Sequence, residues 1–240
     1  MFSQNPLIVA SNHPPFLVGY AQSGLQSGAT MVTPSFLTIG GSTTRLQDLS
    51  PNGLTTPTES EVYVQTLNAY GVTVNQYDWI NYGDDPDFPA GWYDEELNLL
   101  TDDVVFAPGT GLWTSAPSED VSLTSSGKVP KTDVSVTLQN GGTSTGNMMP
   151  IEIDINDIVV SGYTGTTESD VCIQILNAYG QMVTQYDWID YGDDPDFPAG
   201  WYDSELNLIE TGTVKFAPGE GFYVLGTSGA FSIRIPAPEL

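Results

Sequence analysis

Cysteine, histidine and basic residues are nearly absent from this chain. Its 240 residues include one Cys, one His and five Lys or Arg. The single cysteine, Cys172, excludes a disulfide within the chain, and Cys and His are too few for a tetrahedral zinc site. The single histidine, His13, lies between proline and asparagine in an amino-terminal segment that the rest of the chain does not repeat, so a nucleophile triad built on histidine is not expected. The sequence therefore predicts a protein without enzymatic activity.

Acidic residues outnumber basic ones by 30 to 5, which gives a formal net charge of −25. Such a surface repels nucleic acid phosphates and anionic lipids and attracts cations, so we expect no nucleic acid partner. No apolar stretch approaches the roughly 18 residues of a membrane span, so we expect no membrane insertion. A hydrophobic content of 40% favours packed cores over disorder. This combination of strong negative charge and hydrophobic content is typical of a folded protein in a salty or extracellular medium.

A secretion signal with a basic amino-terminal region is also lacking. We expect localisation outside the cell or at the cell surface. The chain would then be a processed form, or would be exported without such a signal.

What the sequence does contain is a tandem duplication. The segment YGDDPDFPAGWYD occupies 82–94 and again 191–203, an offset of 109 residues. The match extends upstream to 58–62 and downstream to 106–111, where a one-residue insertion raises the offset to 110. The predicted organisation is an amino-terminal extension, 1–15, followed by two units near the usual domain size, 16–128 and 129–240.

Strand signals recur along each unit, and helical periodicity is absent. Residues 61–67 and 72–80 are rich in β-formers and flank Asn68-Ala-Tyr-Gly71, which predicts a hairpin that 171–189 repeats. Residues 107–111 and 217–221, with Pro before Gly, predict type II turns. The fold class predicted is all-β, with two tandem β-sandwich-like domains from an internal duplication. Further strands fit 31–38, 120–124, 132–138, 150–155 and 230–235.

Several short motifs occur in an order that resembles a known group of proteins. They are Val18-Gly19-Tyr20, Met31 to Phe36, Gly91 to Asp94, Pro108 to Gly111 with Trp113, and Leu123 to Val129. In this order they look like a group of uncharacterised predicted secreted bacterial proteins that also contain two tandem β-units. The resemblance implies an extracellular or surface setting, and no activity or site residue.

Each copy of the repeated block holds three closely spaced carboxylates, which are candidate calcium ligands: Asp84, Asp85, Asp87, Asp193, Asp194 and Asp196. Calcium prefers six to eight oxygen ligands, and Asp-rich loops supply them. Pro89 and Ala90 fall where an EF-hand loop needs a ligand and a glycine, so the site would be of another kind. The alternative is a solvated acidic turn whose Asp side chains cap backbone amides. Calcium is the one cofactor that the sequence suggests.

The block is also rich in aromatic residues, which are candidates for a glycan-stacking platform or an interface: Trp79, Tyr82, Trp92, Tyr93, Trp188, Tyr191, Trp201 and Tyr202. A platform in each unit would bind bivalently. The alternative is that these rings form the private core of a long loop. A glycosidase needs two carboxyl groups about 5–10 Å apart, which sequence spacing does not establish, and each unit is short for such an enzyme.

The amino-terminal extension contains an apolar strand candidate at Leu7, Ile8 and Val9. It would either complete the first unit of its own chain or add to a sheet edge in a neighbouring subunit. Head-to-tail addition that does not close produces filaments.

The function expected from these features is that of a non-enzymatic structural protein that self-assembles into an extracellular filament or surface layer, with other copies of itself as partners. The alternative is a carbohydrate-binding or calcium-stabilised adhesin module that uses the repeated acidic-aromatic loops to bind glycans.

Overall fold

The computed structural model describes residues 18–54, 58–117, 120–138, 140–162, 167–226 and 231–238. These residues form twenty strands and two 3-10 helices, η1 (Leu46–Asp48) and η2 (Ile155–Asp157), which confirms the all-β prediction. The extension 1–15, with Leu7, Ile8, Val9 and His13, lies outside the described residues.

Ten strands belong to the first unit and ten to the second. The first ten are β1 (Val18–Gly24), β2 (Gly28–Val32), β3 (Thr44–Arg45), β4 (Leu49–Asn52), β5 (Thr58–Leu67), β6 (Thr73–Asn81), β7 (Gly91–Tyr93), β8 (Val105–Phe106), β9 (Leu112–Ala116) and β10 (Ser122–Lys128). The second ten are β11 (Val134–Thr137), β12 (Gly141–Gly146), β13 (Ile153–Asp154), β14 (Val159–Ser161), β15 (Thr167–Leu176), β16 (Met182–Asp190), β17 (Gly200–Tyr202), β18 (Lys215–Phe216), β19 (Gly221–Gly226) and β20 (Ser232–Ile235).

The two units share one topology. The first contains sheets of order β2-β9-β5-β6-β7, β1-β10-β4 and β3-β8, and the second repeats each order with every strand number raised by ten. The predicted hairpins are β5–β6 and β15–β16, which are antiparallel and in equivalent registers, Val64 opposite Tyr77 and Ile173 opposite Tyr186. Each unit is therefore a set of small antiparallel sheets.

Each unit has its own hydrophobic core, built from equivalent positions. The first core includes Leu46, Val62, Val64, Trp92 and Leu112. The second includes Ile155, Val171, Ile173, Trp201 and Phe222. Burying one such side chain contributes about 1.5–3 kcal/mol, so each core gives its unit a separate source of stability. Cys172 is a buried free thiol on β15, and burial raises its pKa to about 11.

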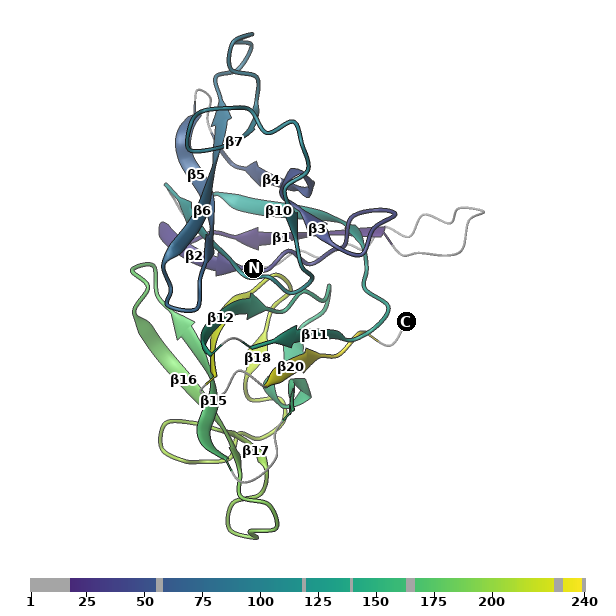
Figure 1. Ribbon diagram of the computed structural model, residues 1–240, viewed down its shortest axis with the longest axis vertical. Helices are drawn as coiled ribbons and strands as arrows, with labels where there is room; N and C mark the ends of the chain where they lie inside the picture. The colour runs from purple at the N-terminus through teal and green to yellow at the C-terminus, as the bar shows by residue number, and fades with distance from the viewer. Residues whose placement is uncertain are drawn as a thin grey trace.

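The units lie one above the other along the long axis of the molecule (Figure 1). Their contacts are exchanged in pairs. A Cβ built on Gly28 at the start of β2 would lie 3.0 Å from Cβ of Ala178, and a Cβ on Gly141 at the start of β12 would lie 2.7 Å from the carbonyl oxygen of Ala69. Ala69 and Ala178 are equivalent positions in the two hairpin turns. Paired contacts of this kind characterise two-fold symmetric dimers, so the chain is a dimer-like arrangement of its own halves.

The predicted type II turns also lie between the units. Gly109 and Gly219 have φ of 82° and 77°, and the hydrogen bonds Thr110 N to Ala107 O (3.1 Å) and Glu220 N to Ala217 O (3.0 Å) close the turns, which confirms the prediction. Each turn contacts the other unit. The amide of Gly111 donates to Ser144 O, and the amide of Thr33 donates to Gly219 O, both over 2.9 Å.

Candidate functional site

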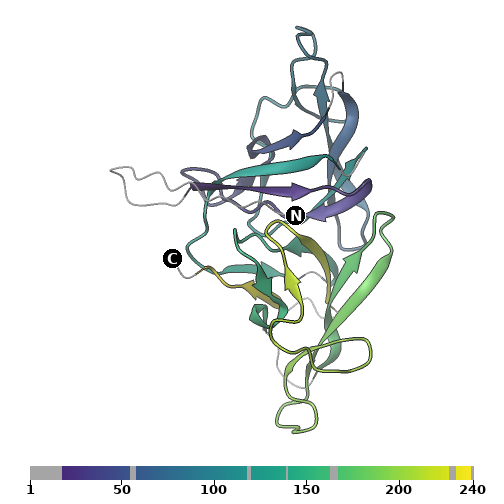
Figure 2. The ribbon, with the colours of Figure 1, turned by 180° about the vertical axis from the view of Figure 1, so that it is seen from behind.

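The two copies of the acidic-aromatic loop lie at opposite ends of the long axis. The first copy connects β6 to β7, and the second connects β16 to β17. One lies at the top of the molecule and the other at the bottom, in both the front and the rear views (Figures 1 and 2). The near two-fold relation of the units therefore gives the molecule two equivalent ends, which we call the tips (82–99 and 191–208).

An edge-to-face pair of tryptophans lies at the base of each tip. Trp79 and Trp92 have ring centroids 5.3 Å apart, and Trp188 and Trp201 have theirs 5.4 Å apart. Trp92 is 3% exposed, and its indole N–H donates to Leu49 O over 3.0 Å. Trp201 is fully buried and donates to Ile158 O over 3.1 Å. These bonds anchor the base of each loop to the strand β4 or to the end of η2.

The remaining rings pack upon one another within the loop. Phe88 lies 5.6 Å from Tyr82 and 6.3 Å from Tyr93, and the hydroxyl of buried Tyr93 donates to Pro89 O over 2.7 Å. The second tip repeats the arrangement with Tyr191, Phe197 and Tyr202. Burial, then the neighbouring Asp85 or Asp194, raises the pKa of Tyr93 and Tyr202. The fully buried rings serve as loop core, and a sugar could stack on them only after the loop opened.

The carboxylates predicted as calcium ligands are all solvent-exposed in the tips: Asp84, Asp85, Asp87, Asp193, Asp194 and Asp196. Asp85 and Asp194 each cap the loop, because Oδ1 accepts from the amide of Asp87 or Asp196 over 2.9 Å. Among the described residues, no group of three or more Asp, Glu, His or Cys is arranged to hold a metal ion. A calcium ion at the tips stays a prediction.

A strained turn follows each tip's last aromatic residue. Asp94 Oδ1 accepts from the amides of Glu96 (3.0 Å) and Asn98 (2.8 Å), and the side-chain and backbone bonds of Asn98 lower the pKa of Asp94. Leu97, at φ 61°, is 50% exposed, as is its equivalent Leu206 at φ 61° and 51%. A leucine rarely takes a left-handed conformation. Each tip thus presents an apolar side chain to solvent at a cost in backbone energy.

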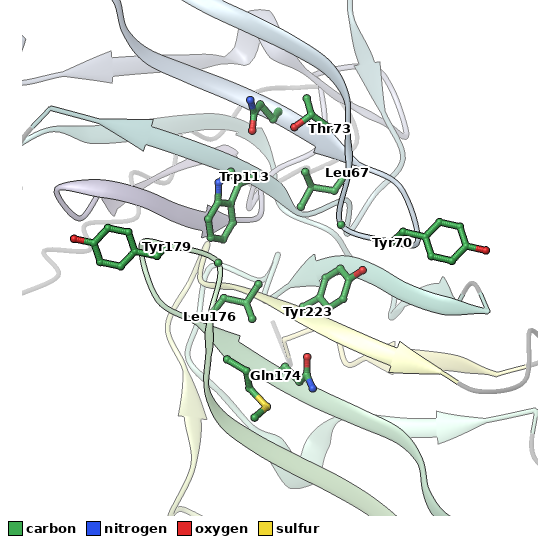
Figure 3. A pocket seen from close by; sticks show the side chains of 12 residues that line it. Leu67, Tyr70, Thr73, Trp113, Gln174, Leu176, Tyr179 and Tyr223 are labelled. Atoms are coloured by element: carbon green, nitrogen blue, oxygen red, sulfur yellow. The ribbon is translucent and has the colours of Figure 1, made fainter.

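A second site, which the sequence did not indicate, lies between the units. It is a cleft of about 450 Å³, lined by the same six positions of each unit. The first unit contributes Gln65, Leu67, Tyr70, Gly71, Thr73 and Trp113. The second contributes Gln174, Leu176, Tyr179, Gly180, Met182 and Tyr223. Tyr70 and Tyr179 extend outward on the two sides, while Trp113 and Tyr223 lie nearer the middle (Figure 3).

The glutamines of this cleft are oriented by buried carboxylates. The amide nitrogen of Gln76 donates to Asp78, and the amide nitrogen of Gln65 donates to Oε1 of Gln76 over 2.7 Å. The second unit repeats the arrangement: Gln174 donates to Gln185 over 2.8 Å, and Gln185 donates to Asp187 over 2.9 Å. A carboxylate oxygen accepts hydrogen bonds, so each buried aspartate fixes the amide orientation of the glutamine that donates to it. That glutamine in turn fixes the orientation of the glutamine that lines the cleft, and we call this chain of bonds a relay.

One sequence signal, LNAYG at 67–71 and 176–180, marks this cleft in retrospect. The hairpin turn requires Asn at its start and Gly at its end, which the hydrogen bonds confirm: Gly71 N donates to Asn68 O over 3.0 Å, and Asn68 Oδ1 accepts from Tyr70 N. The turn does not require an exposed tyrosine, yet Tyr70 is 85% exposed and Tyr179 is 87% exposed. An exposed aromatic residue kept in both copies is the signal that turn chemistry leaves unexplained.

Comparison with protein-family models, with curated proteins and with solved structures finds no match to this chain. The resemblance to secreted two-unit bacterial proteins is therefore still a prediction. Within the described ranges, no helix is long and apolar enough to cross a membrane.

Proposed function

We propose that the protein is a non-enzymatic structural protein that joins end to end through its tips, forming an extracellular filament or surface layer. The observation that carries the proposal is the placement of two copies of one exposed loop at opposite ends of the long axis (Figure 1). A molecule with two equivalent ends that bind each other polymerises without a further site.

The proposal includes two sandwich-like units as rigid building blocks. Supporting it, Leu123 of the three-stranded sheet and Val62 and Val64 of the five-stranded sheet belong to one buried cluster. Side chains from two sheets that share one core are what a sandwich requires. An extracellular setting fits the net charge of −25, which keeps a concentrated protein soluble.

Each tip offers both an adhesive and a repulsive group. Next to the carboxylates lie the exposed leucines Leu97 and Leu99, and the equivalents Leu206 and Leu208. Two tips in contact would bury these leucines and would bring the carboxylates of both molecules together. Like charges repel, so the contact needs cations. Calcium bound by carboxylates of both tips supplies them and gives the predicted metal ligands their role.

Sedimentation velocity and negative-stain microscopy test the proposal. We expect the protein to form linear polymers at high concentration with calcium, and to return to monomers when a chelator is added. A protein that stays monomeric at high concentration with calcium contradicts it.

Matched variants locate the contact. Leu97→Asn with Leu206→Asn removes the apolar group from both tips and suits the left-handed backbone, so it should abolish polymers without unfolding the protein. Val74→Thr with Val183→Thr changes the two equivalent exposed valines at the hairpin ends of β6 and β16, opposite the tips, and should leave the polymers intact. Asn at the six aspartates predicted as calcium ligands should make assembly independent of calcium.

A further inference from the structure

The cleft between the units carries an inference that does not depend on assembly. We propose that it binds a neutral oligosaccharide, with a sugar ring against Trp113 and the sugar hydroxyls donating to the amide oxygens of Gln65 and Gln174.

The cleft has the size and composition of a ligand site. Its volume of about 450 Å³ lies within the roughly 300–1,000 Å³ typical of small-molecule sites. Trp113 and Gln65 are cross-strand partners on β9 and β5, and Tyr223 and Gln174 are partners on β19 and β15. Trp113 is partly exposed beside Gln65, and it pairs an apolar surface with a hydrogen-bonding group. Tyr223 is 8% exposed and its hydroxyl donates to Ala69 O over 3.2 Å, so its ring forms the floor of the second half-site.

Charge excludes most other ligands. None of the twelve lining residues is Asp, Glu, Lys or Arg, so the cleft offers no counter-charge to an ionic ligand. The net charge of −25 repels anions from the surroundings. An anionic occupant is therefore excluded, and a neutral one fits the uncharged lining.

The two hydrogen-bond relays determine which hydrogen-bonding group a ligand of the cleft must have. Gln65 and Gln174 each direct an N–H inward to the next glutamine, which leaves the amide oxygen for the cleft. In Figure 3 the oxygen of Gln174 points toward Tyr223 and its nitrogen points away. Within the described part of the chain, no protein group donates to either oxygen. A fixed acceptor selects a ligand with hydroxyl donors, and a donor-rich molecule with flat apolar faces is a sugar.

Leu67 and Leu176 line the cleft between these groups, and Tyr70 and Tyr179 flank it on opposite sides (Figure 3). The tyrosines are 85% and 87% exposed. Their placement lengthens the aromatic surface across both units, which favours a chain of several sugars over a single one.

The test uses the full chain in its monomeric state, with chelator present. Isothermal titration calorimetry and tryptophan fluorescence are recorded against cellohexaose, xylohexaose, mannohexaose, maltohexaose and chitohexaose, with oligogalacturonate as the anionic counterpart. We expect saturable binding of at least one neutral sugar and none of the anionic one. If no neutral sugar saturates, or if the anionic sugar binds equally well, the proposal is overturned.

Variants identify the cleft as the site. Trp113→Ala should weaken binding at least about tenfold, as is common when a central aromatic residue is truncated. Trp113→Tyr, which reproduces the residue at the equivalent position 223, should retain binding. Gln65→Met with Gln174→Met keeps the shape and removes both acceptors, so it should also weaken binding about tenfold. Tyr20→Ala, at an exposed tyrosine of β1 outside the cleft, should have no effect.

Equal affinity in wild type, Trp113→Ala and the double methionine variant would overturn the proposal, because the sugar would then bind elsewhere. Loss of self-association in Trp113→Ala, with no sugar bound by wild type, would show that a second copy occupies the cleft and would also overturn it. None of these variants changes a tip, so failure of sugar binding leaves the polymer proposal standing, and the reverse holds as well.

Discussion

Leu97 and Leu206 are held in a conformation that costs a non-glycine residue about 1–2 kcal/mol. The capping bonds of Asp94 and Asp203 are the same in both tips, and the fourth residue of each turn has the same left-handed φ of 61°. Asn or Gly would form the same turn at a lower cost in backbone energy. Leucine at this position in both copies is therefore explained by its exposed side chain, and not by the turn.

Replacing both leucines with Asn should raise the stability of the monomer. The gain expected is about 0.5–1 kcal/mol per site, because Asn tolerates the left-handed region better than Leu. Urea unfolding of the double variant, followed by circular dichroism at low concentration with chelator, measures it. A clear loss of stability would show that the leucines pack within their own chain, which their 50% and 51% exposure opposes.

Among the strands and turns, the Pro-Gly turns illustrate how one element serves both units. A Cβ on Gly109 would lie 2.7 Å from Cγ2 of Val136, and a Cβ on Gly219 would overlap Oγ of Ser23. In both cases the neighbour belongs to the other unit. These glycines therefore fulfil two requirements, a positive φ and a close approach between units.

Gly109→Ala with Gly219→Ala should destabilise the protein by about 1–3 kcal/mol per site. Thermal and urea unfolding measure the loss. Gly71→Ala is the matched control, because Gly71 also has a positive φ, 73°, and nothing lies within 4 Å of its Cβ position. Gly71→Ala should lose only the part of the stability that comes from strain in the left-handed backbone. Equal losses at Gly109 and Gly71 would mean that the contact between units contributes little.

At the scale of strands and turns, the sequence predicted the hairpins and turns well and the ends of other strands poorly. The hairpin strands expected at 61–67 and 72–80 are β5 (Thr58–Leu67) and β6 (Thr73–Asn81), since alternation and the Asn-x-x-Gly turn are local signals. The strand expected at 31–38 ends at Val32, because the Thr33 amide donates to Gly219 of the other unit and Pro34 has no amide hydrogen.

Other differences have local as well as distant causes. The strand expected at 150–155 is reduced to β13 (Ile153–Asp154), because Asp154 caps η2 and turns the chain. The glycine-rich β12 (Gly141–Gly146) was not predicted at all, since its glycines admit Tyr223 and the other unit's hairpin turn. In the tips, the sequence supplied both the aromatic core and the acidic turns as alternatives. The cleft needed the arrangement of the two units, which no local pattern contains.

At the scale of the whole molecule, the main feature is the large net negative charge. With 30 acidic and 5 basic residues, repulsion acts across both units. The ion pairs of Arg45 with Asp48 and Asp103, of Lys215 with Glu152 and of Arg234 with Asp133 are all at least partly exposed. Exposed pairs each contribute about 0–1 kcal/mol. They offset little of the repulsion.

The melting temperature should therefore rise by a few degrees as sodium chloride is raised from low to physiological concentration, because salt screens charges separated by more than about 8–10 Å. Differential scanning calorimetry at constant pH measures this. Potassium chloride should act alike, since screening depends on ionic strength and not on the cation. A melting temperature unaffected by either salt would mean that the acidic residues are too dispersed to repel one another.

The cleft's six pairs of positions are related by near two-fold symmetry, yet Trp113 of the first unit corresponds to Tyr223 of the second, and Thr73 corresponds to Met182. In a dimer of identical chains, any substitution alters both half-sites at once, and an elongated ligand binds in two equivalent directions. Joining the halves in one chain removes both restrictions. Each half-site can mutate alone, and the two orientations of a ligand differ in energy. An elongated ligand of the proposed kind would therefore bind in one preferred direction.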